Sequence, residues 1–270
     1  MGGPTVAVRT TSAHLSAPGR RTAAGGTYGA WLDRQFARIV ILPTTAMMVL
    51  IFGIPLMFSL YLSFQGWSPE KSLFSGVFVG IDNYDDLLTD PQFLTSLSIT
   101  FLYTATTVAA ELAAGLSIAL LLNIDLPYIA FFRTALVIPM MITPIIAALC
   151  WKLLLDPDHG VIDYWIGQHT VWLGRSDTAL LSVALVNVWQ NAPYVAVLLL
   201  AGLRSLPSEP LEAAAIDGAS RLQMFWHVTL PLLRPYILVA LLLRTIFEFR
   251  AFDNVYVMTS GGPANATMVL

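Results

Sequence analysis

Charged residues and cysteine are both scarce in this chain. Only 11% of its 270 residues are charged, whereas 56% are hydrophobic and the mean hydropathy is +0.70. A typical soluble domain carries about 25% charged residues, so this composition cannot cover a water-facing surface. Lipid is therefore the expected solvent for most of the chain, and a soluble enzyme is excluded. The single cysteine, Cys150, permits neither a disulfide within the chain nor a cysteine metal cluster.

Several kinds of functional motif are also missing. The net charge of −3 gives no basis for binding nucleic acid. The four histidines lie outside the apolar runs without ligand spacing, so we expect no metal site and no bound cofactor. A phosphate-binding G-x-x-x-x-G-K-[ST] loop is absent, so the chain cannot be an ATPase. A membrane-embedded hydrolase is disfavoured because the apolar runs contain neither a Ser/His pair nor a His-Glu-x-x-His motif. We therefore expect a non-enzymatic protein.

Long apolar runs are what the sequence does contain. A helix needs about 20 residues to cross the roughly 30 Å hydrocarbon core of a bilayer. The sequence predicts an all-α, polytopic transmembrane bundle with five visible spans, at about 39–64, 97–122, 134–155, 179–203 and 235–257. Pro139 and Pro144 are expected to bend the third span, although a packing role is nearly as compatible with their positions. A further apolar run begins near Leu270, and it predicts a sixth helix.

The basic residues predict the orientation of the bundle. Cytoplasmic connections are enriched in Lys and Arg, and most basic residues here fall on one side of the predicted spans. We therefore expect a disordered cytoplasmic tail over 1–38 and a membrane domain over 39–270. On the cytoplasmic side we place Arg9, Arg20, Arg21, Arg34, Arg38, Arg133, Arg204, Arg221 and Arg234. The two external connections contribute only Lys71 and Arg175.

The cytoplasmic connection over 204–234 is patterned as a bent pair of short helices. Ser208 is expected to cap the first helix, with Glu209 and Glu212 in its positive first turn. Gly218 can adopt the left-handed conformation that ends a helix. Such a shape suits a groove on another protein. A plain interfacial connection explains the helix signals equally well.

A second short helix should follow this bend. Ser220 is expected to cap it, and the helix should run through His227 before Pro231 and Pro235 close it. The same stretch carries a recognisable motif. Glu212-Ala213-Ala214, Asp217-Gly218-Ala219 and Leu230-Pro231 resemble the EAA loop of binding-protein-dependent ABC importers.

The resemblance extends to the carbohydrate-uptake permeases of the maltose type and covers roughly 39–270. Three further stretches are similar to that family, namely Phe78–Tyr84, Trp189–Tyr194 and Phe252–Pro263. The resemblance implies a bacterial inner-membrane permease subunit that imports a sugar with a second permease, two ATP-binding cassette subunits and an extracytoplasmic sugar-binding protein. Those partners, and not this chain, would use ATP and Mg²⁺. It also implies that an ATPase subunit contacts Glu212, Ala213, Ala214, Asp217, Gly218 and Ala219.

The fourth span carries the first group of candidate substrate residues. Asn187, Gln190, Asn191 and Tyr194 lie near its middle, where polar groups are costly and usually functional. Amides both donate and accept hydrogen bonds, and an aromatic ring can stack on a sugar ring. These positions match the family's sugar-contacting helix. Alternatively, the amides hydrogen-bond to neighbouring helices.

The fifth span carries the second group, Arg244, Phe247, Glu248 and Ala251, at positions matching a second sugar-contacting helix. The alternative is that Arg244 and Glu248 form a self-neutralising pair inside the bundle, and both roles are compatible. Glu111 has no polar companion on its own span, so we expect it to pair with another helix.

Two other transport functions remain open from the residues alone. An ion-coupled secondary transporter could use Glu111, Lys152, Arg244 and Glu248 as a relay, but it leaves the EAA segment unexplained. Within the ABC class, amino acids or polyamines are alternative substrates. Amide and aromatic side chains favour an uncharged polyol instead.

Overall fold

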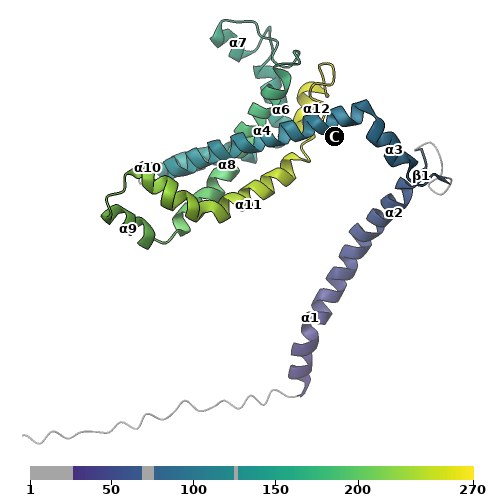
Figure 1. Ribbon diagram of the computed structural model, residues 1–270, viewed down its shortest axis with the longest axis horizontal. Helices are drawn as coiled ribbons and strands as arrows, with labels where there is room; N and C mark the ends of the chain where they lie inside the picture. Colours follow the sequence, from purple (N-terminus) through teal and green to yellow (C-terminus); the bar gives the residue numbers. More distant parts are fainter. Residues whose placement is uncertain (1–26, 69–75, 125–126) are drawn as a thin grey trace, which may run out of the picture. The chain divides into compact units, whose positions relative to one another are not determined.

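The computed structural model describes residues 27–68, 76–124 and 127–270, and it divides into two units. The first unit ends at Asn83 and the second begins at Tyr84. Among the described residues almost all regular structure is helical, as predicted (Figure 1). The exception is a short antiparallel pair, β1 (Gln65–Gly66) with β2 (Val77–Phe78).

The first unit contains one long apolar helix. It comprises α1 (Thr27–Met48), the π-helix η1 (Val49–Gly53) and α2 (Ile54–Ser63). The stretch Val40–Ser63 is long and apolar enough to cross a membrane, in agreement with the first predicted span. The helix begins at Thr27 rather than Ile39, so the tail predicted over 1–38 is wrong from Thr27 onward. Residues 1–26 of that tail lie outside the described residues.

Both π-helices in the described chain end just before a proline. In η1 the amide of Ile54 donates to the carbonyl of Val49, directly before Pro55. In η2 (Phe225–Thr229) the amide of Leu230 donates to the carbonyl of Phe225, directly before Pro231. A proline ring clashes with the carbonyl four residues earlier. The wider π turn lets the helix continue past that clash.

Three long helices form the centre of the second unit. These are α4 (Pro91–Leu122), α8 (Ala179–Ser205) and α11 (Leu230–Glu248), which pack side by side (Figure 1). Glycine permits the closest approaches between them. A Cβ at Gly115 would lie 2.5 Å from the side chain of Val195, and one at Gly202 would lie 2.6 Å from the ring of Tyr236. Small residues at such contacts are typical of membrane helix packing.

Two prolines shape the third span as predicted. α5 (Ile129–Met141) contains Pro139, and α6 (Pro144–Leu154) begins at Pro144. The two helices meet at an angle of 96°. The residue before a proline is driven to an extended conformation, and Thr143 adopts φ −63° and ψ 144°. The predicted span 134–155 is therefore a pair of helices with a sharp bend between them, as the two prolines predicted.

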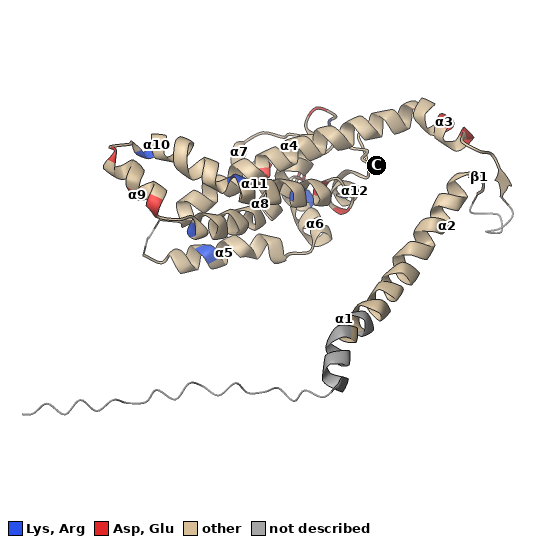
Figure 2. Ribbon diagram, turned by 60° about the horizontal axis from the view of Figure 1, so that its bottom comes forward, with Lys and Arg blue, Asp and Glu red and all other residues tan. Residues whose placement is uncertain are grey.

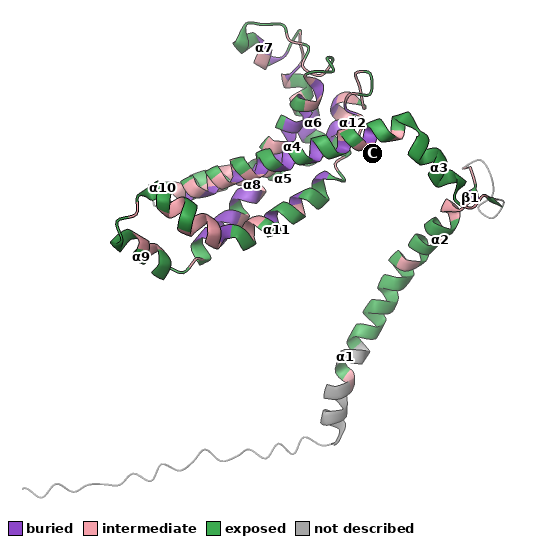
Figure 3. Cartoon of the chain, viewed as in Figure 1, coloured by how far each residue is buried: buried purple, intermediate pink, exposed green. Residues whose placement is uncertain are grey.

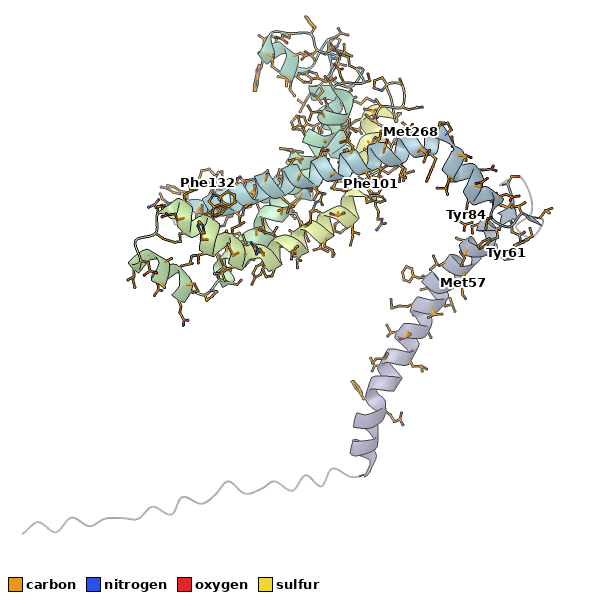
Figure 4. All side chains as sticks on the ribbon, viewed as in Figure 1. Met57, Tyr61, Tyr84, Phe101, Phe132 and Met268 are labelled. Atoms are coloured by element: carbon orange, nitrogen blue, oxygen red, sulfur yellow. The ribbon has the colours of Figure 1, made fainter. Side chains whose placement is uncertain are left out.

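The last helix differs most from its predicted bounds of 235–257. The short helix α10 (Arg221–Met224) runs through η2 into α11, which ends at Glu248. After a break, α12 covers Asp253–Thr259. The break removes the exposed, charged Arg250 and Asp253 from the apolar helix. At the break, the ring of Phe101 on α4 (labelled in Figure 4) meets that of Phe249 edge-on, with centroids 5.3 Å apart.

Buried residues concentrate where the central helices face one another, whereas most of the described α1–α2 surface is exposed (Figure 3). The described residues include four helices suited to spanning a membrane, or five with the bent pair. One core cluster joins α4, α8 and α12 through Tyr103, Val183 and Val255. A second joins α4, α8 and α11 through Ala119, Leu199 and Leu233. The sixth helix stays a prediction.

Candidate functional site

An ionic group lies in the interior of the second unit. Arg244 on α11 binds the carboxylate of Glu111 on α4 through two hydrogen bonds, of 2.7 Å from Nε and 2.8 Å from Nη2. Nη2 also contacts the carboxylate of Glu248, one turn along α11. Glu111 is fully buried, and Arg244 and Glu248 are 5% and 3% exposed. The predicted pairing of Glu111 with another helix is therefore confirmed, and so is the Arg244–Glu248 pair.

Asn187 joins this ionic group to α8. Its Nδ2 donates to the hydroxyl of Tyr103 at 2.8 Å and to the carboxylate of Glu248. Tyr103 is fully buried, and Asn187 is almost so. One amide therefore connects α4, α8 and α11 at the level of the buried charges.

The break between α5 and α6 supplies a further partner. The chain is extended at Ile142 and Thr143, directly before Pro144, so the carbonyl of Ile142 lies between the two helices and outside both. Gln190 Nε2 donates to this carbonyl at 2.7 Å. The break between α5 and α6 thus presents a backbone acceptor, and Gln190 on α8 satisfies it.

Two more amides complete the cluster. Asn191 Nδ2 donates to Asn187 Oδ1 at 2.5 Å. Asn254, on the first turn of α12, donates from Nδ2 to Asn187 Oδ1 at 3.2 Å and to Gln190 Oε1 at 3.3 Å. The polar side chains of four helices are therefore linked in one continuous network.

A cavity of about 500 Å³ opens beside this network. All eight residues predicted to contact substrate line it: Asn187, Gln190, Asn191, Tyr194, Arg244, Phe247, Glu248 and Ala251. Met140, Pro144, Arg250, Phe252, Asp253 and Asn254 complete the lining. The structure thus brings the two predicted groups together at one place. Whether they bind substrate stays a prediction.

The lining combines two kinds of surface. Asn191 and Tyr194 are only half-buried, and Phe247 is 54% exposed, so amide, hydroxyl and aromatic groups are accessible. Asn187 and Gln190 bond to neighbouring helices, as the structural alternative proposed, and they also form part of the cavity wall. Such a lining can exchange hydrogen bonds with hydroxyls while ring faces pack against C–H groups.

Tyr103 and Asn254 are members of the network that the sequence analysis did not assign. Polar and small residues recur on the buried face of α4 at helical spacing, at Thr100, Tyr103, Thr107 and Glu111. This pattern could have predicted that Tyr103 faces other helices, because polar residues on an otherwise apolar span usually point into the bundle. Asn254 falls near the end of the predicted span 235–257, and in the structure it lies on the separate helix α12 that follows the break after Glu248.

The α8–α11 connection is the second candidate site. It contains α9 (Glu209–Ile216) and α10, which lie at the end of the bundle away from α12 (Figure 1). Gly218 has φ +76°, and the amides of Gly218 and Ala219 donate to the carbonyls of Ala215 and Ala214. This Schellman arrangement confirms the predicted end of the first helix.

Two details of the connection differ from prediction. Ser208 makes no capping hydrogen bond with its side chain, because its own backbone is already helical, with φ −74° and ψ −29°. Ser220 does cap α10 through a reciprocal pair of bonds with Gln223, as predicted. The second short helix does not end near His227, however, because the π turn carries it past Pro231 into α11.

α9 contacts the bundle through Leu211. Leu211 is half-buried and lines a small hollow with Leu203 and Phe225. Glu212 and Asp217 are exposed, and acidic residues mark the α9 segment in Figure 2. The six predicted ATPase-coupling residues lie on α9 and its following turn: Glu212, Ala213, Ala214, Asp217, Gly218 and Ala219.

Charges outside the predicted spans have a different environment. In the connection before α8, Arg175 binds the carboxylate of Asp177 through bonds of 3.1 and 2.7 Å, and both side chains are exposed. The hydrogen bonds from Arg175 lower the pKa of Asp177. Backbone amides of His159 and Asp158 likewise lower the pKa of Asp156.

Several spans around a polar cavity, together with an exposed and rigidly bent connection, define a polytopic membrane transport protein. The family of binding-protein-dependent transport system inner membrane components matches residues 112–270, and the chain belongs to it. It is therefore a multi-pass inner-membrane protein and the permease subunit of an ABC importer, as the motifs predicted. The findings do not favour the ion-coupled alternative.

Similar proteins are found over most of the chain. A probable ABC transporter permease protein of Sinorhizobium fredii, y4oQ, is 39% identical over 85% of this chain and 75% of its own length. The trehalose/maltose transport system permease protein MalF of Thermococcus litoralis is 37% identical over 87% of this chain and 80% of its own. In Mycobacterium tuberculosis, the trehalose transport system permease protein SugA is 34% identical, covering 94% and 79%.

A solved structure shares the fold. A chain of a bacterial ABC transporter involved in the import of the acidic polysaccharide alginate superimposes with a TM-score of 0.73. The match covers 90% of this chain and 83% of that one, at 23% identity. At this identity the likeness supports the helical architecture and not a shared substrate.

Proposed function

We propose that this permease subunit carries a neutral sugar, delivered by an extracytoplasmic binding protein, through the cavity between α8, α11 and α12. The observation that carries this proposal is the joint lining of one cavity by all eight predicted substrate residues. Amides supply donors and acceptors for hydroxyls, and Tyr194 and Phe247 supply ring faces. The names of relatives that transport trehalose and maltose support the same substrate class.

The buried charged residues of the cavity wall, Arg244 and Glu248, also favour a neutral solute. Arg244 is bound to both Glu111 and Glu248, so its positive charge is already neutralised inside the bundle. A carboxylate substrate would have to compete with these two partners. An ammonium group faces the same competition for Glu248. Sugar hydroxyls can bind without displacing a partner of Arg244 or of Glu248.

The mechanical part of the proposal concerns the α9 segment. An ATPase subunit would drive the conformational change of this chain through the exposed surface of α9 and the turn at Gly218. A second permease would complete the pathway, and hydrolysis of ATP would take place on the partner subunits. This assigns a non-catalytic role to the chain. It also places the N-terminal side of α1 and the α9 segment in the cytoplasm, in agreement with the distribution of arginines.

Alternating access provides the link between the two sites. α8 leads into α9, and α10 leads back into α11, so the two helices that line the cavity also flank the coupling segment. The ring of Tyr236 packs on Gly202, and its hydroxyl lies 2.5 Å from Ser205 Oγ, which joins α8 and α11 at the base of that segment. A displacement of α9 therefore acts on both walls of the cavity.

The proposal is tested by reconstituting the subunit with its partner permease, ATPase subunits and binding protein in liposomes. Uptake of labelled trehalose, maltose and glucose is measured with ATP, with a non-hydrolysable analogue and with an uncoupler. We expect uptake of at least one sugar that requires hydrolysable ATP and withstands the uncoupler. Uptake that withstands removal of ATP but collapses with the uncoupler would contradict the proposal, and so would transport of none of the sugars.

A further inference from the structure

One buried hydrogen-bonding atom in the cavity wall has no partner. The described part of the chain contains four such side-chain atoms: Thr104 Oγ1, Thr107 Oγ1, Arg133 Nε and Asn254 Oδ1. Of these four residues, Asn254 alone lines the cavity. Asn254 is 5% exposed, and no donor among the described residues lies within hydrogen-bonding distance of its Oδ1. Burying a hydrogen-bonding group without a partner is costly, and such groups in native proteins need an explanation.

The hydrogen-bond network determines which end of the Asn254 amide is free. The carboxylate of Glu248 can only accept, so Asn187 must turn its NH₂ group toward it. Asn187 Oδ1 then faces Asn254. The carbonyl of Ile142 can also only accept, so Gln190 must turn its NH₂ group toward it.

Both neighbours of Asn254 therefore present oxygen. Gln190 Oε1 and Asn187 Oδ1 lie 3.3 and 3.2 Å from Asn254 Nδ2, which donates to both. Reversing the Asn254 amide would place its oxygen against two other oxygens. The carboxylate of Glu248 and the carbonyl of Ile142 can only accept, and together they fix the orientation of all three amides. Asn254 therefore donates from Nδ2, and its acceptor Oδ1 has no partner.

We propose that Asn254 Oδ1 accepts a hydrogen bond from one hydroxyl of the transported sugar and makes that hydroxyl a requirement for transport. This inference deepens the proposed function and depends on it. Asn254 belongs to the cavity lining, so a hydroxyl of a bound solute supplies the donor that the described residues lack. A site built to pair with a hydroxyl discriminates strongly against an analogue that lacks it, because the buried group is then left unpaired.

The test uses the complete transporter with its binding protein in liposomes. The probes are trehalose and maltose with their sets of monodeoxy and deoxyfluoro analogues. With the wild-type chain we expect kcat/KM for uptake to fall about 10- to 100-fold when one particular hydroxyl is removed. Fluorine cannot donate, so the deoxyfluoro analogue at that position should lose as much. Restoration of uptake by fluorine would overturn the proposal, because the hydroxyl would then be acting as an acceptor.

The variant Asn254→Leu removes the acceptor at similar size. Uptake of the parent sugar should fall by a similar factor, and the discrimination at that one hydroxyl should disappear while discrimination at other positions remains. The same binding protein delivers each sugar to both permeases, so its own selectivity cancels in the comparison. A purely structural role for Asn254 would weaken uptake of all analogues alike. Asn254→Ala provides a second variant if the leucine variant does not assemble.

Gln168→Leu is a matched control, because Gln168 is an exposed amide outside the cavity. The Gln168→Leu transporter should discriminate among the deoxy and deoxyfluoro analogues as the wild type does. The proposal is overturned if the Asn254 variants retain the wild-type discrimination at every hydroxyl, or if the wild-type chain discriminates at none. Failure of the proposed function is recognisable separately, because the wild-type transporter would then take up no sugar before any variant is compared.

Discussion

Polar residues inside the bundle and polar residues at its ends are held in different ways. Inside, Arg244 binds Glu111 and Asn187 donates to Tyr103, so polar side chains satisfy one another through bonds between helices. At the end formed by α9 and α10, the backbone sets the shape, through the turn at Gly218 and the cap at Ser220, while water solvates the charges. The comparison teaches that interior changes should disturb the fold first. Changes at the ends should disturb coupling while leaving the fold intact.

The largest effect is expected from Arg244→Met. It leaves Glu111 and Glu248 buried beside each other without their shared cation. Removing one partner of a buried ion pair costs about 3–5 kcal/mol. We therefore expect a large loss of folded, assembled protein, measured by size-exclusion chromatography after heating in detergent. The triple variant Glu111→Gln, Arg244→Met, Glu248→Gln should recover part of that stability. If Arg244→Met were as stable as the wild type, the conclusion that interior changes disturb the fold first would be wrong.

The next effect concerns Gly218→Val at the other region. Gly218 has φ +76° with no atom near its added Cβ, so the cost is backbone strain of about 1–2 kcal/mol rather than a clash. We expect the protein to insert and remain folded while ATP-driven uptake falls roughly tenfold or more. Glu212→Lys, which reverses an exposed charge on α9, should act in the same direction.

Gly167→Val is the matched control for the glycine variant. Gly167 has φ +70°, again with open space around it, but it ends α7 (Val161–Ile166), far along the chain from the coupling segment. It carries the same kind of strain without touching the proposed ATPase contact, so uptake should be close to wild type. Equal losses in both glycine variants would show that strain, and not coupling, causes the defect.

A smaller effect is expected from Asn191→Leu. Asn191 lines the cavity and is half-buried, and its amide donates to Asn187. Its loss removes one hydrogen-bonding group from the wall without leaving a charge unpaired. We expect about a tenfold loss in kcat/KM of sugar uptake, while the complex with the ATPase subunits forms normally. If uptake by the variant depended on sugar concentration as in the wild type, Asn191 would not belong to the substrate site.

The smallest effect is expected at Arg175 and Asp177, an exposed ion pair. Arg175 lowers the pKa of Asp177 in the folded state. Any stabilisation is therefore present above the unfolded pKa of about 3.9 and is lost only as the pH falls through the lower folded value. Between pH 5 and 8, Asp177→Asn should shift the melting temperature by no more than about 1 °C. A larger shift would mean that the ends of the bundle contribute to stability as the interior does.

The prediction from sequence succeeded where a pattern is local. The apolar runs located the spans, because their length must match the bilayer. Gly218 and Ser220 were assigned correctly, because each acts on backbone groups within a few residues. Ser208 was assigned wrongly as a side-chain cap, because the helical conformation of its own backbone leaves the hydroxyl unused.

The ends of the last helix could not be predicted for a similar reason. The apolar pattern continues through Val257, but α11 stops at Glu248. Its beginning was also missed, since Pro231 looks like a terminator unless a π turn precedes it. Both features depend on how the chain accommodates charged or cyclic residues in three dimensions.

The amino-acid order alone determined that this is a polytopic helical protein with an EAA segment and two polar groups on separate spans. Lipid burial and local backbone geometry enforce those properties on any chain with this sequence. The tertiary structure decided that Arg244 pairs with Glu111, that Gln190 meets the carbonyl of Ile142, and that Asn254 reaches the cavity. These partners lie far apart in sequence, and a side chain selects among distant donors and acceptors only when helix packing brings them within about 3 Å.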